Sequence, residues 1–342
     1  MFRIEWELTG VKNLNVKFHK NEQYDSCFSL VGVDAAVANA FRRIMIAELP
    51  SLAIEQIYVF NNTSIIQDEV LCHRLGLIPL TGSKTGLQWM VPYRKPPPED
   101  DPAAKAAAAK SGEYDNPAHT IPSDQNTIVM HLNVECKWRE GGKQLAKQGE
   151  QDPEKLYENS SVYARHLTFE PQGQQSNYFP DDDAVRPMNP DILVAKLRPG
   201  QQIKLTCHCV MGIGADHAKF SPVATASYRL LPYIHIKEPI LGADAKKFAR
   251  CFPRGVIELE DDAESGQKKA VVKDTMKDTV SRECLRHDEF KDKVQLGRIR
   301  DHFIFSVEST GQSDSDELFV ESVKALKAKA ERFKRNLNDL VG

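Results

Sequence analysis

An almost wholly apolar segment near the N-terminus constrains the fold of this chain more than any other feature. The sequence between Asp34 and Pro50 predicts a helix over residues 35–48. Asp34 can accept hydrogen bonds from the first free amides of the helix, and Pro50 cannot continue one. Only four residues within it are polar, namely Asn39, Arg42, Arg43 and Glu48. Because a surface helix normally keeps a broad polar face, we expect this one to pack on its own sheet and on a second surface, for which another chain is favoured.

A second helix is predicted at the C-terminus by apolar residues spaced alternately four and three positions apart. They are Phe319, Val323, Leu326, Ala330, Phe333, Leu337 and Leu340. This heptad spacing gives a narrow apolar seam along which one neighbouring helix packs. Acidic residues precede the seam and basic residues lie toward its end, as the helix dipole favours. The pattern leaves open whether the neighbour belongs to this chain or to a partner.

Strand-like segments accompany these helices and predict an α+β fold. They fall at residues 5–8, 16–18, 27–31, 53–60, 127–136, 203–210 and 303–307, and a hairpin is expected from 256–259 and 270–272. Residues 94–126 combine a proline run, an acidic cluster and an Ala/Lys tract, which is typical of a long mobile loop. Another polar loop is expected at 139–158. We expect a mainly β insertion over residues 63–219 between the two halves of a discontinuous domain, residues 1–62 and 220–342.

Composition restricts the compartment and the partners. The chain has 342 residues, of which 41% are hydrophobic and 27% charged, as in ordinary globular proteins. Its formal net charge of −3 argues against direct binding of a polyanion, so any contact with DNA is expected to be indirect. No apolar run approaches the roughly 20 residues of a membrane helix, so no membrane partner is expected. Seven scattered cysteines suit a reducing compartment.

Two groups of residues invite a reading in terms of metal binding or catalysis. Cys207 and Cys209 would share one face of a strand while His208 points to the other, so the three cannot ligate one ion. His217 lies close in sequence to Ser221, but neighbouring residues do not build a catalytic triad. We therefore expect no catalytic residue, metal or cofactor. A hydrolase or metal enzyme that uses His217, Cys207 or Cys209 is the alternative from a different class, and a metal assay would reveal it.

Four blocks of the sequence resemble the α-subunit family of cellular RNA polymerases, which includes bacterial α and its archaeal counterpart. Residues 38–44 (ANAFRRI) are similar to the motif of the family's paired dimerisation helices. Residues 62–79 are similar to a block whose last residues read HRLGLIP, and residues 217–232 and 301–311 match two later blocks. The resemblance covers both ends of the chain. Within the family, residues 31–50 look most like the branch shared by eukaryotic RNA polymerases I and III.

The resemblance implies a non-catalytic assembly subunit of nuclear RNA polymerases I and III, present in the nucleolus as well. It implies a dimerisation domain that is interrupted by an insertion domain and pairs with a smaller α-like subunit. The second-largest catalytic subunits and small zinc-binding adaptor subunits would dock on that pair. The paralogous α-like subunit of RNA polymerase II is the near alternative. It is disfavoured because the zinc-binding cysteine cluster expected in that paralogue is absent here.

Partner contacts are expected on both predicted helices. The residues are Val37, Ala38, Asn39, Phe41, Arg42, Arg43, Ile44, Met45, Phe319, Val323, Leu326 and Phe333. In the family the double arginine lies near the contact to a large catalytic subunit, although a solvated helix edge would also explain Arg42 and Arg43. Aspartate in place of Phe41 or Ile44 is accordingly expected to abolish partner binding.

Overall fold

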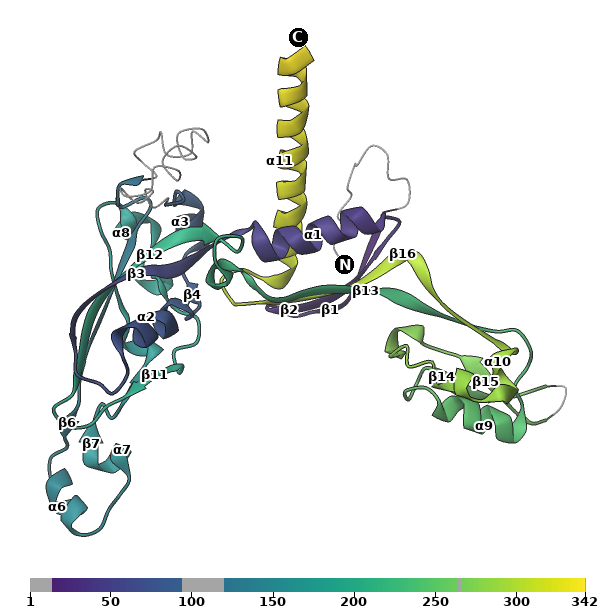
Figure 1. Ribbon diagram of the computed structural model, residues 1–342, viewed down its shortest axis with the longest axis horizontal. Helices are drawn as coiled ribbons and strands as arrows, with labels where there is room; N and C mark the ends of the chain where they lie inside the picture. Colours follow the sequence, from purple (N-terminus) through teal and green to yellow (C-terminus); the bar gives the residue numbers. More distant parts are fainter. Residues whose placement is uncertain (1–13, 94–119, 264–265, 342) are drawn as a thin grey trace. The chain divides into compact units, whose positions relative to one another are not determined.

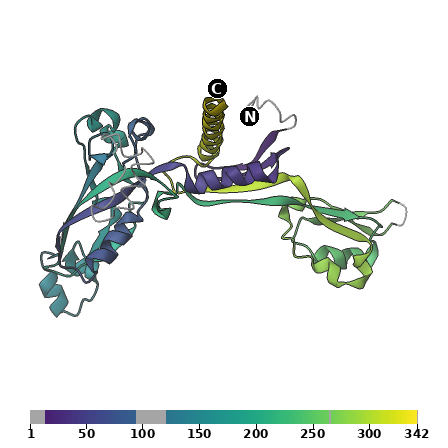
Figure 2. The same ribbon diagram turned by 45° about the horizontal axis from the view of Figure 1, so that its top comes forward.

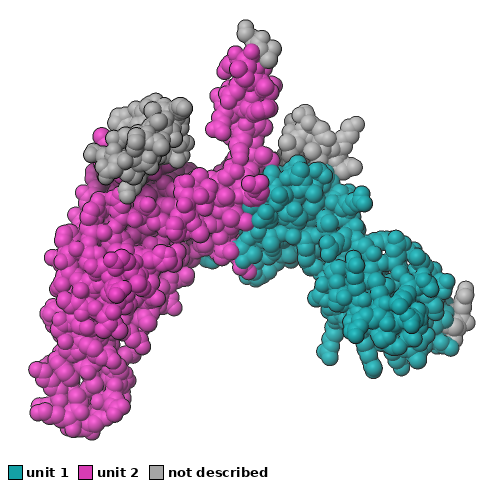
Figure 3. Space-filling model, viewed as in Figure 1, with its two compact units in different colours: residues 1–42, 225–307 teal, residues 43–224, 308–342 magenta. Residues whose placement is uncertain are grey.

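The computed structural model describes residues 14–93, 120–263 and 266–341. The predicted strand at residues 5–8 and most of the predicted loop at 94–126 lie outside these ranges. Contacts within the chain divide it into two units, which Figure 3 colours separately. Unit 1 comprises residues 1–42 and 225–307, and unit 2 comprises residues 43–224 and 308–342. Helices and sheets both occur, which confirms the predicted α+β class.

A four-stranded sheet forms the centre of unit 1. Its strands are β1 (Asn15–Asn21), β2 (Asp25–Val31), β16 (Val294–Ser309) and β13 (Val223–Ile236), in that order. Strands from opposite ends of the sequence are therefore neighbours, and the Phe28 ring of β2 stacks on the Phe305 ring of β16 with 5.3 Å between centroids. In Figures 1 and 2 the N-terminal turns of α1 (Ala35–Ala47) lie over one face of this sheet.

A smaller cluster of elements completes unit 1. The helices α9 (Gly242–Arg250) and α10 (Asp288–Lys291) pack with the antiparallel hairpin of β14 (Ile257–Asp261) and β15 (Lys268–Val272). The fully buried rings of Phe248 and Phe290 meet edge to face at 5.3 Å. The pairing of β14 with β15 confirms the predicted hairpin.

Unit 2 is built around a second four-stranded sheet. Its strands are β3 (Pro50–Asn62), β12 (Gln202–Ile213), β5 (Ile128–Glu135) and β9 (Thr168–Glu170), in that order. The helix α2 (Asp68–Gly76) packs against it through Leu71 and Leu75, which are fully buried in the same apolar core. Shorter elements complete this part: β4 (Leu80–Thr81), α3 (Lys84–Trp89), β6 (Lys137–Trp138), α6 (Gly142–Lys147), α7 (Pro153–Leu156), β7 (Tyr157–Glu158), β8 (Ser161–Tyr163), α8 (Gln175–Tyr178), β10 (Arg186–Pro187) and β11 (Leu193–Lys196).

The prediction of a polar loop over residues 139–158 was wrong in part, because α6 and α7 lie within it. Gly141, at a φ of 76°, reverses the chain before α6. The Asp152 carboxylate accepts a hydrogen bond from the Glu154 amide at 3.0 Å and so begins α7. A left-handed glycine before α6 and a side-chain cap at α7 allow these short helices to form in spite of the polar composition.

The ends of α1 follow the sequence signals closely. The Ala36 amide donates to the Asp34 carboxylate at 3.2 Å, and the helix stops at Ala47, three residues before Pro50 begins β3. The division between the two units falls inside this helix, after Arg42. Each unit therefore contains one part of α1.

Candidate dimerisation surface

One face of α1 is covered by the chain itself. Its residues are Ala38, Phe41, Ile44 and Met45, and none of their side chains is more than 5% exposed. They recur at the three- and four-residue spacing of one helix face. Because this face is already buried, aspartate at Phe41 or Ile44 would disrupt folding before it tested partner binding.

The opposite side of α1 shows that the two adjacent arginines are not equivalent. The Arg42 guanidinium donates from Nη2 and Nε to the Asn39 side-chain oxygen, at 2.9 and 3.1 Å. Arg43 is exposed and makes no ion pair or side-chain hydrogen bond within the described residues. Ala36, also exposed, and the partly buried Ala40 add small side chains to this side, which permits close approach of another element. Arg43 is thus the arginine available to a partner.

The second helix of interest, α11 (Ser315–Val341), is anchored to unit 2 by its first turns. Leu318 and Phe319 are buried, and the buried Ser322 hydroxyl donates to the Phe319 carbonyl at 2.6 Å. Val323 and Leu326 are partly buried. The first half of the heptad seam therefore packs within this chain.

Polar contacts fix the base and the middle of α11. The Lys84 ammonium lies 2.9 Å from the Glu317 carboxylate, and the Lys329 ammonium lies 2.8 Å from that of Glu48. Just before the helix, the buried Gln312 side chain donates to the carbonyl oxygen of Leu80 and accepts from the amide of Leu52. The direction of α11 from unit 2 is therefore set by several independent contacts.

The second half of α11 is exposed. Every residue from Lys327 to Leu340 is solvent-exposed, and this half of the helix extends away from the rest of its unit in Figures 1 and 3. Phe333, Leu337 and Leu340 are 66, 44 and 82% exposed. We call Ala330, Phe333, Leu337 and Leu340 the exposed seam. An exposed apolar row of this kind is typical of surfaces that bind another protein.

The heptad spacing left open whether the neighbour of the seam belongs to this chain or to a partner. Within this chain, the two halves of the seam differ. The seam residues up to Leu326 have intramolecular neighbours, and those from Ala330 onward are exposed. Leu337 and Leu340 were not among the predicted contact residues, although the spacing that selected Phe333 also contained them. Contact of any of these residues with a partner stays a prediction.

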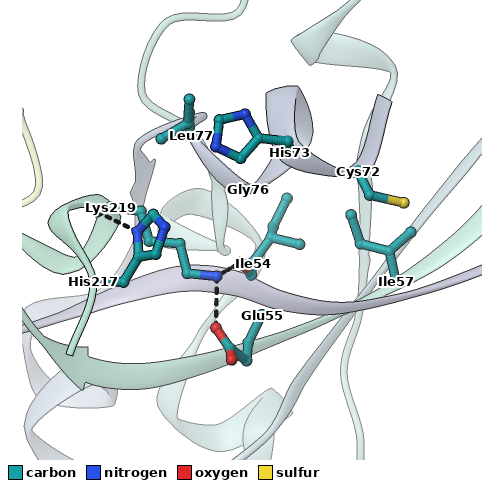
Figure 4. A pocket seen from close by; sticks show the side chains of 9 residues that line it. All are labelled: Ile54, Glu55, Ile57, Cys72, His73, Gly76, Leu77, His217 and Lys219. Atoms are coloured by element: carbon teal, nitrogen blue, oxygen red, sulfur yellow. Dashed lines mark hydrogen bonds and ion pairs between the residues drawn. The ribbon is translucent and has the colours of Figure 1, made fainter. Parts of the chain in front are cut away.

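A shallow hollow in unit 2 contains His217, one of the side chains that invited a catalytic reading (Figure 4). It has a volume of about 260 Å³ and is lined by Ile54, Glu55, Ile57, Cys72, His73, Gly76, Leu77, His217 and Lys219. The Lys219 ammonium, whose side chain is 11% exposed, donates to the Ile54 carbonyl at 2.8 Å and pairs with Glu55 at 2.6 Å. His217 Nδ1 accepts from the Lys219 amide at 3.1 Å. These groups bind η3 (Ala218–Phe220) to β3.

The cysteines of β12 are buried as the strand alternation predicted. Cys207 and Cys209 face the core, and His208 lies on the other face with its ring 4.8 Å from that of Tyr58. Burial raises the pKa of Cys207 to about 12 and that of Cys209 well above its usual value. Burial, with the nearby Asp68 carboxylate, also raises the pKa of Cys72. At neutral pH these thiols are protonated and therefore weak nucleophiles.

The described residues hold neither a metal-binding cluster nor a membrane-spanning helix. Within residues 14–93, 120–263 and 266–341, no group of three or more His, Cys, Asp or Glu side chains is placed to hold a metal ion. None of the described helices has the length and hydropathy needed to cross a bilayer.

Comparison with known proteins places most of the chain, including all of α1 and the first part of α11, in one family. Residues 27–330 match the family described as the RNA polymerase Rpb3/Rpb11 dimerisation domain. The chain is 49% identical, over 96% of its length and 90% of the relative's, to the DNA-directed RNA polymerases I and III subunit RPAC1 of Saccharomyces cerevisiae. The human protein of the same name is 44% identical over 94% of this chain and 84% of its own. The DNA-directed RNA polymerase II subunit rpb3 of Dictyostelium discoideum is 26% identical over 94% of each chain.

Proposed function

Because this chain belongs to the RNA polymerase Rpb3/Rpb11 dimerisation domain family, we propose that it is the non-catalytic assembly subunit shared by DNA-directed RNA polymerases I and III. It is a structural subunit and contributes no catalytic residue. Its identity to polymerase I and III relatives is 49 and 44%, against 26% for the polymerase II relative, which disfavours the paralogue alternative. As a subunit of nuclear RNA polymerases, the chain is expected in the nucleus. We propose that, as a subunit of polymerase I, it is present in the nucleolus as well.

The exposed seam of α11 is the observation that carries this function. The side chains of Phe333, Leu337 and Leu340 are exposed to solvent in the isolated chain. Burying a side chain of this size fully contributes about 1.5–3 kcal/mol. A dimerising subunit would cover this seam with a helix of its partner, for which we propose the smaller α-like subunit. The isolated chain would be prone to aggregate through the same surface.

The pair would then act as a platform for the rest of the enzyme. Arg43, exposed and without an ion partner among the described residues, suits a contact to the second-largest catalytic subunits, because arginine is favoured as an interface anchor. Small zinc-binding adaptor subunits would dock on the same platform. We retain residues 1–62 and 220–342 as the dimerisation domain and 63–219 as the insertion. Contact with DNA would be indirect.

The alternative of a hydrolase or metal enzyme has little support. His217 accepts a backbone hydrogen bond at Nδ1, and Lys219 is held by Glu55 and by the Ile54 carbonyl, so both side chains have structural roles in the hollow of Figure 4. The thiols of Cys207 and Cys209 are buried and protonated.

The function is tested by affinity purification of the tagged full chain from nuclei, followed by quantitative mass spectrometry. We expect the largest subunits of polymerases I and III to co-elute at stoichiometric amounts, without those of polymerase II. A tagged polymerase II subunit, purified in parallel, shows that polymerase II survives the extraction. Recovery of polymerase II alone would select the paralogue, and recovery of a lone monomer would contradict an assembly role.

A further inference from the structure

In the exposed half of α11, the charged residues that lie beside the apolar seam are all positive, which the seam alone does not require. Successive residues of a helix are rotated by 100°, so the positions that flank a heptad seam are fixed. On one side of the exposed seam these positions hold Lys327 and Lys334, and on the other side Lys329 and Asn336. No acidic residue flanks the exposed seam.

The acidic residues of the same half lie on the far side of the helix. Glu331 and Asp339 occupy positions turned away from the seam, together with Arg332 and Arg335. Both signs of charge are therefore present in this half of α11, but only positive charge lies beside the apolar row. A solvated helix face would have no reason to separate them in this way.

The lysines differ in how this chain uses them. Lys329 is paired with Glu48 at 2.8 Å. Lys327 and Lys334 are exposed and make no ion pair with any residue that the structure describes. These two ammonium groups are thus available to a helix that covers the exposed seam.

A second copy of this chain would meet like charges across the seam. In a parallel pair of helices, position 329 of one copy faces position 334 of the other. In an antiparallel pair, positions on the same side of each helix face each other, which sets Lys327 against Lys334. Both arrangements bring lysine against lysine, and like charges at these positions disfavour pairing, most strongly in the antiparallel pair, because Glu48 already pairs with Lys329.

We propose that the lysine-flanked seam of α11 selects a partner helix whose own apolar seam is flanked by acidic residues, and rejects a second copy of this chain. The occupant is a helix of the smaller α-like subunit, so the inference rests on the proposed function and adds the charge pattern by which that partner is chosen. Charge complementarity sets the choice of partner, while burial of the seam supplies most of the affinity.

Two neighbouring charge reversals test this inference in the full chain. Lys334→Glu changes a flanking position, and Arg335→Glu makes the same change of charge on the far side of the helix. Each variant is co-expressed with the smaller α-like subunit, and the dissociation constant is measured at low and high salt. We expect Lys334→Glu to weaken the pair roughly three- to tenfold at low salt and less at high salt, because the flanking pairs are solvent-exposed. Arg335→Glu should have little effect.

Sedimentation of each chain without a partner supplies the second readout. Lys334→Glu places a carboxylate opposite lysine in both homodimer arrangements, so this variant should self-associate more strongly than the wild type or Arg335→Glu. Equal effects of the two reversals on pairing, or a stable wild-type dimer held by α11, would overturn the inference while leaving the proposed function intact. If the wild type does not bind the smaller subunit at all, the proposed function fails, and the named partner with it.

Discussion

At the scale of single residues, burial decides which of the suggestive side chains can be chemically active. Cys207 and Cys209 lie in the core of unit 2, and three further cysteines, Cys136, Cys251 and Cys284, are also buried. Burial raises the pKa of each of these thiols because it penalises the charged thiolate. Since the thiolate is the reactive form, they should be inert in the folded chain.

Thiol labelling tests this directly. At pH 8 the native chain should react at Cys27 and Cys72 only, because these two are half-buried, and slowly, because the pKa of each is also raised. Raising the pH to 9 should leave Cys207 unreactive, since its pKa is about 12. All seven cysteines should react in denaturant, which serves as the control. Rapid native labelling of Cys207 or Cys209, located by peptide mapping, would contradict the buried assignment and revive the nucleophile alternative.

The double arginine shows a limit of sequence reasoning at the same scale. The sequence predicted one role for Arg42 and Arg43. The structure separates them, since Arg42 is bound to Asn39 one turn earlier and Arg43 is exposed. Adjacent residues of a helix point 100° apart, so a motif of two identical residues seldom has one environment.

At the scale of elements, α11 performs two tasks with one repeating pattern. Its first turns close the core of unit 2 through Leu318 and Phe319. Its second half carries the same apolar spacing into solvent at Phe333, Leu337 and Leu340. Substitutions in the two halves should therefore separate stability from partner binding.

Phe333→Ser is expected to leave the free energy of unfolding of the isolated chain within about 0.5 kcal/mol of the wild type, because the side chain is exposed. It should weaken pairing with the smaller α-like subunit by about 2 kcal/mol, or roughly thirtyfold, through lost apolar burial. Denaturant unfolding and a binding titration measure the two effects. Ala328→Ser, on the far side of the helix, is the matched control and should change neither.

Phe41→Asp provides the contrast in α1. It places a carboxylate where the side chain is 5% exposed, so it should destabilise the chain itself by several kcal/mol. If Phe333→Ser destabilises the isolated chain as much as Phe41→Asp does, the exposed seam is part of the folded core. If Phe333→Ser pairs normally, the seam is not the interface.

At the scale of the whole molecule, local sequence signals predicted where helices and strands lie better than they predicted which residues pack around them. Asp34 and Pro50 marked the ends of α1, and alternation marked the buried face of β12. The heptad spacing located α11. A repeating pattern cannot reveal which part of the helix is buried by the rest of the chain, because burial depends on contacts between residues distant in sequence, such as Lys84 with Glu317 and Gln312 with Leu80. The pairing of β2 with β16 is non-local in the same way.

Composition did not predict how the chain divides into units. The division of the described structure into two units falls within the single helix α1. The sequence offers no break there, since α1 is continuous and mostly apolar before and after the pair Arg42 and Arg43. Resemblance to a family, rather than periodicity, predicted that the two ends of the chain belong together.

Backbone hydrogen exchange of α11 is the measurement that tests the central claim most directly. The full chain is compared alone and after co-expression with the smaller α-like subunit, and the amides of residues 315–323 serve as an internal reference because the chain itself covers that part. We expect the amides of residues 327–340 to exchange rapidly in the isolated chain, and at least about tenfold more slowly in the complex, because pairing suppresses local opening of the helix. A stable complex in which these amides exchange as fast as in the isolated chain would contradict the claim that the exposed seam of α11 is the dimerisation surface.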